Sequence, residues 1–458
     1  MKDVYAVIMA AGEGKRMNSN RPKVLHSICG RTLVEWAMHA VGEFCEKPVL
    51  IVGHGADQVK GYLGDRAYYV MQEQQLGTGH AVMMARSYLE GKDGYVVIMA
   101  GDMPLITQAT IRRVVDAMTD EDTEYAAVVL TSRMADPTGY GRIIRRADGT
   151  IRQIVEERDA SDKEKSIKEV NSSVYCFNIR TLLTFIDKLS NNNAQNEYYL
   201  TDCISMMSSK GKKVRALPVI DTSDCMGVND RVQLSVAART LQQRIVEQHL
   251  RSGVTFIDPQ AAYVDCDVTI GRDTIVYPSV VLEGKTAIGE DCILYPSTHI
   301  KDSEVGSHVT VKTSYLEACR VAEGVCIGPF AHIRPQSDIA GGCRIGNFVE
   351  VKNSVIGTGS KVSHLTYVGD ADVGENVNIG CGVVFVNYDG SKKCRSVVED
   401  GCFVGCNSNL ISPVHIGSNA YIAAGSTITE DVPAEALAIA RERQSNKTNW
   451  NKDGMKKK

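Results

Sequence analysis

A glycine-rich stretch near the start of the chain carries the first chemical signal. Residues 10–16 read AAGEGKR and follow VYAVIM, an apolar run with the β-branched makeup of a buried parallel strand. Gly12 and Gly14 permit positive φ and close approach of the backbone, so that N–H groups can face phosphate oxygens. Arg16 and Lys23 supply positive charge beside them. The stretch predicts a phosphate-binding loop, with an ordinary tight turn as the alternative.

The spacing in this loop fits neither of two common nucleotide fingerprints. A Walker loop would need glycine at position 9 and serine or threonine at position 16, where the chain has Met9 and Arg16. A dinucleotide-binding turn would need a third glycine where Met17 stands. The loop therefore indicates phosphate chemistry of another kind.

A carboxylate follows a later apolar run. Asp102 comes directly after YVVIMAG, at the strand end where open α/β sheets bind ligands. An aspartate at a strand end is otherwise often a helix cap. This carboxylate and the lysine in RPK, Lys23, favour a phosphate-binding loop over an ordinary tight turn at residues 10–16.

The elements that must hold these residues follow from the hydrophobic pattern up to about residue 229. Short apolar runs alternate with longer amphipathic ones: VYAVIMA, LVEWAMHAVGEF, PVLIVG, GHAVMMARSYLEG and GYVVIMAGD. This alternation is typical of βαβ units on a mostly parallel sheet. Residues 230–250 keep helical spacing without Gly or Pro, so they predict a connecting helix that ends near Gly253.

A different period begins at Ile270. Large apolar side chains recur every six residues, in three runs that differ in phase. This period fits neither a helix nor a flat sheet, and it is typical of a parallel β-helix whose hexads each form one flat side, three to a triangular coil. The apolar residues predicted to face the axis are Ile270, Val276, Leu282, Ile288, Leu294, Ile300, Ile327, Ile333, Ile339, Ile345, Val351, Val398, Val404, Leu410, Ile416, Ile422 and Ile428.

One segment interrupts this period. Residues 386–397 read VNYDGSKKCRSV, a polar insertion in an otherwise regular solenoid. Such an insertion is either a binding loop or a tolerated surface loop, and the segment alone does not distinguish the two.

Composition narrows the class of protein. The 51 basic and 55 acidic side chains leave a formal charge of −4, so we expect no nucleic-acid partner. The 14 cysteines form no CxxC pair and no histidine cluster at metal-ligand spacing, which favours reduced thiols over a zinc site or disulfide framework. No apolar run is long enough to span a membrane, and no signal peptide precedes the first strand, so we predict a soluble cytoplasmic protein with a solvated basic tail, MKKK.

Motifs spread over nearly the whole chain carry a family resemblance. The first half contains MAAGEGKRMNSNRPKVLH, QEQQLGTGHA, GDMPL, DPTGYGRI, IVEERDA, NNNAQNEYYLTD and GVNDR; the second contains IGPFAHIRP, GNFVEVKN, HLTYVGDADVGENVNIGCG, NYDG and IAAGSTIT. In this order they resemble the bifunctional bacterial N-acetylglucosamine-1-phosphate uridyltransferase and glucosamine-1-phosphate acetyltransferase family. The resemblance implies an α/β Rossmann-like nucleotidyltransferase domain over 1–229, a linker helix over 230–253, a left-handed parallel β-helix of hexapeptide repeats over 254–440 that carries the acetyltransferase, and a tail over 441–458.

The family resemblance also implies an activity. Such enzymes transfer an acetyl group from acetyl-CoA to glucosamine-1-phosphate, then a uridyl group from UTP to N-acetylglucosamine-1-phosphate, releasing pyrophosphate. The resemblance implies Mg²⁺ for uridyl transfer, a homotrimer formed through the β-helix, and a role in peptidoglycan synthesis and cell shape.

For uridyl transfer, the resemblance points to residues in the opening loop and near later strand ends. Asp102 and Asn229 would share the Mg²⁺, since two oxygen ligands completed by phosphate oxygens and water suit this hard cation. Arg16 and Lys23 would hold phosphate and pyrophosphate. Residues implied to bind UTP or the UDP-sugar are Ala10, Ala11, Gly12, Lys23, Gln72, Gln75, Gly77, Thr78, Gly141, Glu156, Asn171 and Asn229, of which 72–78 surround uracil and the three from Gly141 to Asn171 face the sugar phosphate.

For acetyl transfer, His364 in SHLTY matches the family's general base, a role that suits a side chain whose pKa lies near neutrality. Glu350 matches a carboxylate that would orient or tune it. Residues matching the sugar-phosphate site are Arg334, Lys352, Tyr367, Asn378 and Lys393. Residues matching acetyl-CoA contacts are Cys381, Asn387, Tyr388, Cys406, Ala424 and Arg441.

Two rival functions stay open at this point. One is a monofunctional sugar-1-phosphate nucleotidyltransferase whose β-helix is a non-catalytic oligomerisation scaffold. The other is a protein that only binds nucleotide sugars, against which Asp102 and Asn229 argue. A scaffold has no reason to carry the set Lys352, His364, Tyr367 and Asn387.

Overall fold

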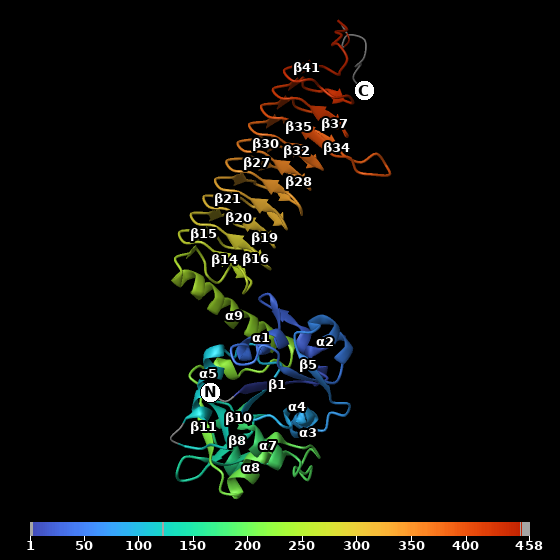
Figure 1. The fold of residues 1–458 in the computed structure, drawn as a ribbon. Helices are drawn as coiled ribbons and strands as arrows, with labels where there is room; N and C mark the ends of the chain where they lie inside the picture. The colour runs from blue at the N-terminus through green and yellow to red at the C-terminus, as the bar shows by residue number, and fades with distance from the viewer. Residues whose placement is uncertain (1–2, 121–122, 449, 451–458) are drawn as a thin grey trace, which may run out of the picture. The chain divides into compact units, whose positions relative to one another are not determined.

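The computed structural model describes residues 3–120, 123–448 and 450 (Figure 1). The chain divides into two compact units, Met1–Leu241 and Gln242–Lys458. The division falls inside helix α9 (Arg231–Arg251), which occupies the stretch predicted to be helical and is followed by Gly253 with φ of +93°. The MKKK run of the predicted tail lies outside the described residues.

The first unit is built on a nine-stranded sheet in the order β11-β7-β10-β6-β1-β4-β5, with β8 and β9 joined to it through β10. Strand β10 runs antiparallel to β6 and β7, while the β1–β4, β1–β6, β4–β5 and β7–β11 pairs are parallel. The strands are β1 (Val4–Ala10), β4 (Val49–Val52), β5 (Tyr68–Met71), β6 (Tyr95–Ala100), β7 (Ala127–Arg133), β8 (Arg142–Arg145), β9 (Ile151–Val155), β10 (Glu169–Asn178) and β11 (Val214–Pro218). A small hairpin pairs β2 (Ser27–Ile28) with β3 (Arg31–Thr32).

Helices cover both faces of this sheet. Successive strand residues point to opposite faces, so Ile8 packs in the core beneath α1, α2 and α5, and Val7 in the core beneath α3, α7 and α8. Helix α1 begins at a capping box in which Thr32 Oγ1 accepts from Glu35 N at 3.3 Å and Glu35 Oε2 accepts from Thr32 N at 2.8 Å. The α-helices are α1 (Leu33–Val41), α2 (Ala56–Leu63), α3 (Thr78–Met84), α4 (Arg86–Leu89), α5 (Gln108–Thr119), α6 (Asp162–Lys165), α7 (Ile179–Ile186) and α8 (Leu200–Ser209), and the 3₁₀ turns are η1 (Lys15–Met17), η2 (Lys23–Leu25) and η3 (Thr222–Cys225).

Strand β1 lies where the strand order reverses. Strands β4 and β5 follow on one side of it and β6 on the other. The carboxyl ends of these four parallel strands meet at one edge of the sheet, where open α/β sheets bind ligands. The loops after Ala10, Val52, Met71 and Ala100 leave this edge, which places the predicted phosphate loop and Asp102 together.

The second unit is a parallel β-helix. Its strands form three parallel sheets of 11, 10 and 9 strands, and consecutive strands pass from one sheet to the next, three to a coil. The first coil consists of β12 (Thr255–Phe256), β13 (Tyr263–Val264) and β14 (Thr269–Ile270). Every residue of the predicted six-residue series is buried. The predicted fold class of both halves is thereby confirmed.

Predicted site residues lie on or beside strands of two of these sheets. In the 11-stranded sheet the strands are β27 (Arg344–Asn347), β30 (Lys361–His364), β33 (Asn378–Ile379), β36 (Phe403–Val404) and β39 (Tyr421–Ile422). In the 10-stranded sheet they are β25 (His332–Ile333), β28 (Glu350–Lys352), β31 (Tyr367–Gly369) and β34 (Val384–Val386). Figure 1 shows the polar insertion as an orange loop that projects from the stack between β34 and β35 (Ser396–Val398).

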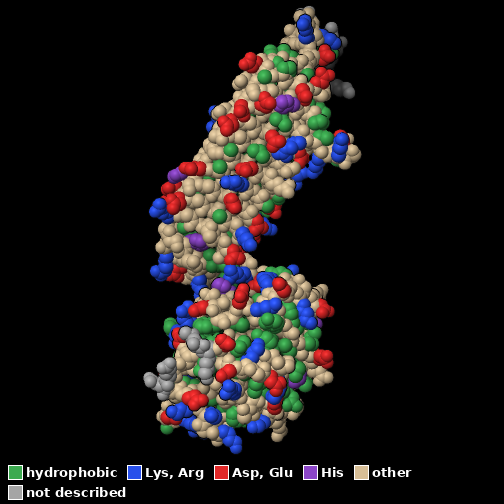
Figure 2. Space-filling view, viewed as in Figure 1, with side chains coloured by type: hydrophobic (Ala, Val, Ile, Leu, Met, Phe, Trp, Pro, Cys, Tyr) green, Lys and Arg blue, Asp and Glu red, His purple; other side chains and the backbone are tan. Residues whose placement is uncertain are grey.

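The distribution of charged side chains and the length of the helices were compared with the expectations for nucleic-acid-binding and membrane-spanning proteins. In the view of Figure 2, basic and acidic side chains are interspersed on both units. Across residues 3–120, 123–448 and 450, no helix combines the length and apolar character needed to cross a membrane.

Candidate active sites

The loops that leave the carboxyl edge of the first sheet contact one another. The His54 N–H donates to the Ala11 carbonyl at 3.4 Å, which joins the loop after β4 to the loop after β1. At Gly53, an added Cβ would lie 2.7 Å from Gln75 Nε2 and 3.0 Å from the Ala11 Cβ. The lack of a side chain at Gly53 therefore lets the opening loop approach the loop after β5.

The two glycines of the opening loop differ in conformation. Gly14 has φ of +66°, and a Cβ there would lie 2.7 Å from the Lys23 Cβ, so glycine is needed both for the backbone and for the approach of Lys23. Gly12 does not adopt positive φ, and a Cβ there would meet nothing within 4 Å. Its missing side chain leaves open space next to the phosphate loop. Arg16 is exposed on η1.

Three distant residues meet below this loop. Lys23 Nζ contacts the Asp102 carboxylate and donates to Asn229 Oδ1 at 3.2 Å. The Val228 N–H donates to the Asp102 carbonyl at 2.9 Å and so ties the segment bearing Asn229 to the end of β6. The positively charged ammonium group of Lys23 thus contacts both of the side-chain oxygens that are predicted to bind Mg²⁺.

These oxygens fit the predicted metal. A carboxylate and an amide carbonyl are hard ligands of the kind that Mg²⁺ takes, and this cation usually completes its shell with phosphate oxygens and water. Among the residues that the structure describes, no group of three or more His, Cys, Asp or Glu side chains is placed to hold a metal ion. A divalent cation here would therefore depend on the substrate for further ligands.

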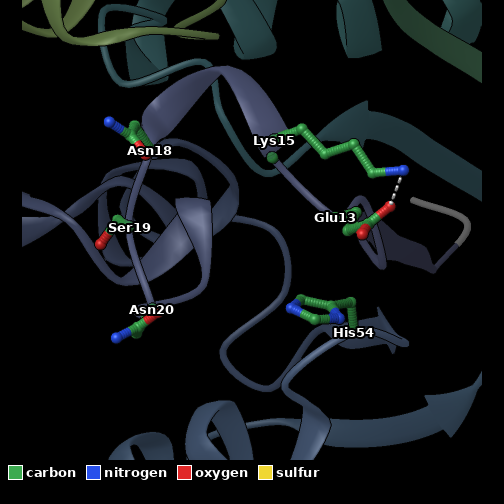
Figure 3. A pocket seen from close by; sticks show the side chains of 7 residues that line it. Glu13, Lys15, Asn18, Ser19, Asn20 and His54 are labelled. Atoms are coloured by element: carbon green, nitrogen blue, oxygen red, sulfur yellow. Dashed lines mark ion pairs between the residues drawn. The ribbon is translucent and has the colours of Figure 1, made fainter.

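A pocket opens beside the loop (Figure 3). Figure 3 shows Asn18, Ser19 and Asn20 along one side of it, with Lys15 and Glu13, paired at 2.9 Å, and His54 on the other. Sequence reasoning did not select His54; its signal is that it stands two residues beyond β4, at the same edge as the phosphate loop.

The residues predicted around uracil form one folded segment. Gln72 is buried, and its Nε2 donates to the Gly77 carbonyl at 3.3 Å. Gln75 Nε2 donates to the Gln72 carbonyl at 3.3 Å. Gly77 has φ of +109° and a Cβ there would lie 2.6 Å from the Tyr198 carbonyl oxygen, while Thr78 Oγ1 accepts from Leu200 N at 3.1 Å. The segment is thus fixed against the start of α8.

The three residues predicted at the sugar phosphate also come together. Asn171 N donates to the Gly141 carbonyl at 2.9 Å, and a Cβ on Gly141 would lie 3.3 Å from Glu156 Oε2. Burial raises the pKa of the Glu156 carboxyl, although Thr201 Oγ1 donates to it at 2.9 Å. Sequence reasoning missed the neighbouring Arg142, whose buried guanidinium pairs with the carboxylate of Glu157 at 2.7 Å.

In the second unit, one corner of the β-helix carries a column of residues that we call the corner column: Asn347, His364, Cys381, Cys406 and Ala424. Backbone hydrogen bonds connect them coil by coil. The carbonyls of the first four accept from the N–H groups of Leu365 (3.0 Å), Gly382 (3.4 Å), Asn407 (2.7 Å) and Gly425 (2.8 Å). Each donor directly follows the next residue of the column. The predicted base and three predicted acetyl-CoA residues therefore share one corner.

Arg441 lies beside the top of this column. A Cβ built on Gly425 would lie 3.7 Å from the Arg441 Cδ. Arg441 is exposed, as is Tyr388 in the insertion, whose hydroxyl donates to the Gly390 carbonyl at 2.7 Å.

The 10-stranded sheet gathers a second group next to the insertion. Asn387 is buried; its Nδ2 contacts the Asp370 carboxylate and donates to the Tyr367 hydroxyl at 3.3 Å. The neighbouring Lys352 ammonium lowers the pKa of Lys393, because two like charges lie close together. Sequence reasoning missed Asp370, which holds Asn387 in place. Two adjacent ammonium groups are suited to a phosphate.

Two predicted residues have other surroundings than expected. Glu350 Oε1 accepts from Arg334 Nη1 at 2.7 Å, and the imidazole Nδ1 of His364 is paired instead with Asn347 Oδ1 at 2.6 Å. In this chain the Glu350 carboxylate therefore pairs with Arg334, and its predicted role of orienting or tuning the base stays a prediction. Asn378 lies on β33 of the 11-stranded sheet, whereas Lys352 and Tyr367 lie on the 10-stranded sheet, so one chain does not group them.

Both units match families of known proteins. The chain matches the MobA-like NTP transferase domain over residues 6–167 and six bacterial transferase hexapeptide repeats over residues 395–430. Fold and sites thus define a two-part transferase enzyme, a nucleotidyltransferase unit followed by a hexapeptide-repeat unit. The curated relatives named bifunctional protein GlmU include those of Acetivibrio thermocellus (52% identical over 451 residues, 98% of this chain and 97% of the relative), Halalkalibacterium halodurans (51% over 451 residues, 98% and 99%) and Caldanaerobacter subterraneus (51% over 458 residues, 100% and 99%). The chain belongs to the family of bifunctional GlmU proteins, as its motifs predict.

Proposed function

We propose that the chain makes UDP-N-acetylglucosamine in two steps, acetylating glucosamine-1-phosphate in the second unit and transferring a uridyl group to the product in the first. The observation that carries this proposal is the placement of His364 in the corner column, beside a sheet that bears the adjacent Lys352 and Lys393. A non-catalytic scaffold needs neither an oriented imidazole nor paired cations. The arrangement therefore favours two activities over the scaffold alternative.

In acetyl transfer, the amine of the sugar attacks the thioester carbonyl. His364 takes the amine proton through Nε2, and the C–S bond of the tetrahedral intermediate breaks with the electron pair leaving on sulfur, which receives a proton from the imidazolium. Lys352, Lys393 and Arg334 hold the sugar phosphate, and Tyr367 lies beside them. Asn387 and Tyr388 receive the thioester end of acetyl-CoA, while Cys381, Cys406, Ala424 and Arg441 bind its arm.

In uridyl transfer, a phosphate oxygen of N-acetylglucosamine-1-phosphate attacks the α-phosphorus of UTP and pyrophosphate leaves. Ala10, Ala11 and Gly12 contact the nucleotide, and Arg16 and Lys23 neutralise the departing charge. Mg²⁺ held by Asp102 and Asn229 would supply further charge neutralisation on phosphate oxygens. The segment from Gln72 to Thr78 binds uracil, and the group at Gly141, Glu156 and Asn171 binds the sugar.

Assembly and location complete the proposal. The exposed rings of Phe330 and Phe348 stack at 5.2 Å on consecutive coils, and the exposed Leu365 follows on the next, an apolar edge that supports a homotrimer formed through the β-helix. Asn378, which lies on another sheet than its own chain's Lys352, would then complete a neighbouring site. We place the enzyme in the cytoplasm, where its product serves peptidoglycan synthesis.

A pair of assays tests the proposal. Free thiol released from acetyl-CoA with glucosamine-1-phosphate reports the first step, and pyrophosphate released from UTP with N-acetylglucosamine-1-phosphate reports the second. We expect both. Pyrophosphate without thiol would favour the scaffold alternative, and neither product would refute the proposal.

A further inference from the structure

We infer that Asn347 is a positioning residue for acetyl transfer, which holds His364 in the tautomer that carries its proton on Nδ1 and leaves Nε2 free to accept one. This inference rests on the acetyl transfer proposed above. The amide oxygen Oδ1 of Asn347 lies 2.6 Å from His364 Nδ1. Because a carbonyl oxygen only accepts hydrogen bonds, Nδ1 must donate. In a neutral imidazole the lone pair then belongs to Nε2.

The backbone builds this pair. Strands β27 and β30 each have four residues, whereas the next strands of the same sheet, β33 and β36, have two. The added length brings Asn347 into direct register with His364. The pair is therefore a product of strand register and not of a chance side-chain encounter.

Two features at this corner keep the strands close. A Cβ built on Gly346 would lie 1.8 Å from the Ser363 carbonyl oxygen, so only glycine permits the approach. Phe348 and Leu365, which follow the paired residues, both adopt positive φ, at 57° and 47°, and turn the chain to the next side of the coil. The N–H of Leu365 donates to the Asn347 carbonyl at 3.0 Å. Hydrogen bonds thus hold Asn347 both at its backbone carbonyl and at its side-chain amide oxygen.

The role assigned to Asn347 differs from that of a structural residue. A base whose tautomer is wrong fails in the chemical step while the substrate still binds, because the phosphate-binding cations are untouched. Loss of the outer partner that orients a metal-bound histidine usually costs about 10–100-fold in metal affinity or activity, and we expect a loss of the same order here. The expected signature is a fall in kcat with little change in KM, together with a change in the protonated nitrogen.

The experiment uses the full-length protein with ¹⁵N-labelled histidine. We expect the ¹⁵N NMR signals of the neutral imidazole of His364, assigned by their loss in His364→Gln, to show Nδ1–H and a free Nε2. Asn347→Leu, close in shape but without an acceptor, should mix the tautomers and lower acetyl-transfer kcat by about 10–100-fold. Asn347→Asp, which keeps an acceptor for Nδ1–H, should restore the tautomer and most of the rate. Uridyl transfer should be unchanged in both variants.

The outcomes separate this inference from the proposed function. A wild-type protein with Nε2–H as the main tautomer would overturn the inference even where acetyl transfer is present, and this readout requires only that the assignment variant His364→Gln folds. A folded Asn347→Leu protein with wild-type kcat would overturn it too. Absence of acetyl transfer in the wild type, with Nδ1–H intact, would instead refute the acetyl-transfer proposal.

Discussion

The two units bring their candidate catalytic residues together by different means. In the first unit, Lys23, Asp102 and Asn229 converge from separate loops at the end of a sheet, and Lys23 and Asn229 are 206 residues apart. In the second, the corner column repeats one position on successive coils, with Asn347 and His364 only 17 residues apart. Loop conformation sets the first site, whereas strand register sets the second. Chemistry that depends on register should therefore be lost when the backbone spacing of coils changes.

The largest effect is expected at Asp102 and would show that the two sites work independently. Asp102→Ala removes the carboxylate that Lys23 contacts and that would hold Mg²⁺, so uridyl transfer should fall by about 10³-fold or more. Acetyl transfer by the same preparation should remain near the wild-type rate. A folded variant that loses both activities would show that the units are coupled.

The next effect belongs to the base of the second unit. His364→Ala should lower acetyl-transfer kcat by about 10²–10⁴-fold, the usual range for a positioned acid or base. KM for the sugar phosphate should change much less, because Lys352 and Lys393 remain. Unchanged kcat with a raised KM would make His364 a binding residue.

A third test addresses register directly. Gly346→Ala places a Cβ 1.8 Å from the Ser363 carbonyl oxygen and must separate β27 from β30, which should destabilise the second unit by about 1–3 kcal/mol and reduce acetyl transfer. Gly341→Ala, in the same coil, is the matched control, since its Cβ would meet the Glu323 carbonyl oxygen at an ordinary 3.4 Å. Equal melting curves for both variants would argue that register tolerates this spacing.

The smallest effect concerns stability in the first unit. Burial raises the folded-state pKa of Glu156 above its unfolded value, so this carboxyl favours folding below the unfolded pKa and loses that contribution as pH rises through the folded pKa. Glu156→Gln stays neutral, so its gain in melting temperature should grow as pH rises from the unfolded pKa to the folded pKa and stay constant above it. Fluorescence of the buried Trp36 can follow the transition. A gain that is the same at every pH would exclude titration of this carboxyl as its cause.

Sequence predicted the two folds well because each hydrophobic period reports directly which side chains face a core. It did not predict that β10 is antiparallel, since the apolar pattern of a buried strand carries no direction. Family motifs identified Gly141, Glu156 and Asn171, whose separations follow no period. The conformations of Gly12 and Gly14 differ although the residues are two apart, because each depends on what the loop packs against.

In the β-helix, the sequence pattern did not predict how many residues each coil contains. The pairs Lys361↔Asn378, Asn378↔Phe403 and Phe403↔Tyr421 give successive coils of 17, 25 and 18 residues. The family motifs alone grouped Asn378 with residues of another sheet, and they did not select Asn347. Once the coil lengths are known, subtracting one coil from His364 finds Asn347. A periodic fold thus allows a catalytic neighbour to be located by counting.

The corner column also sets a scale of length. Neighbouring strands lie about 4.8 Å apart, so the three steps from His364 through Cys381 and Cys406 to Ala424 rise by about 14 Å. If acetyl-CoA lies along this column with its far end at Arg441, the length of the column sets the distance that the pantetheine arm of the acyl donor must span. An acyl donor whose arm is shorter by the spacing of one coil would leave its thioester about 5 Å from His364. The enzyme would then select its donor by the length of the arm as well as by the group at its end.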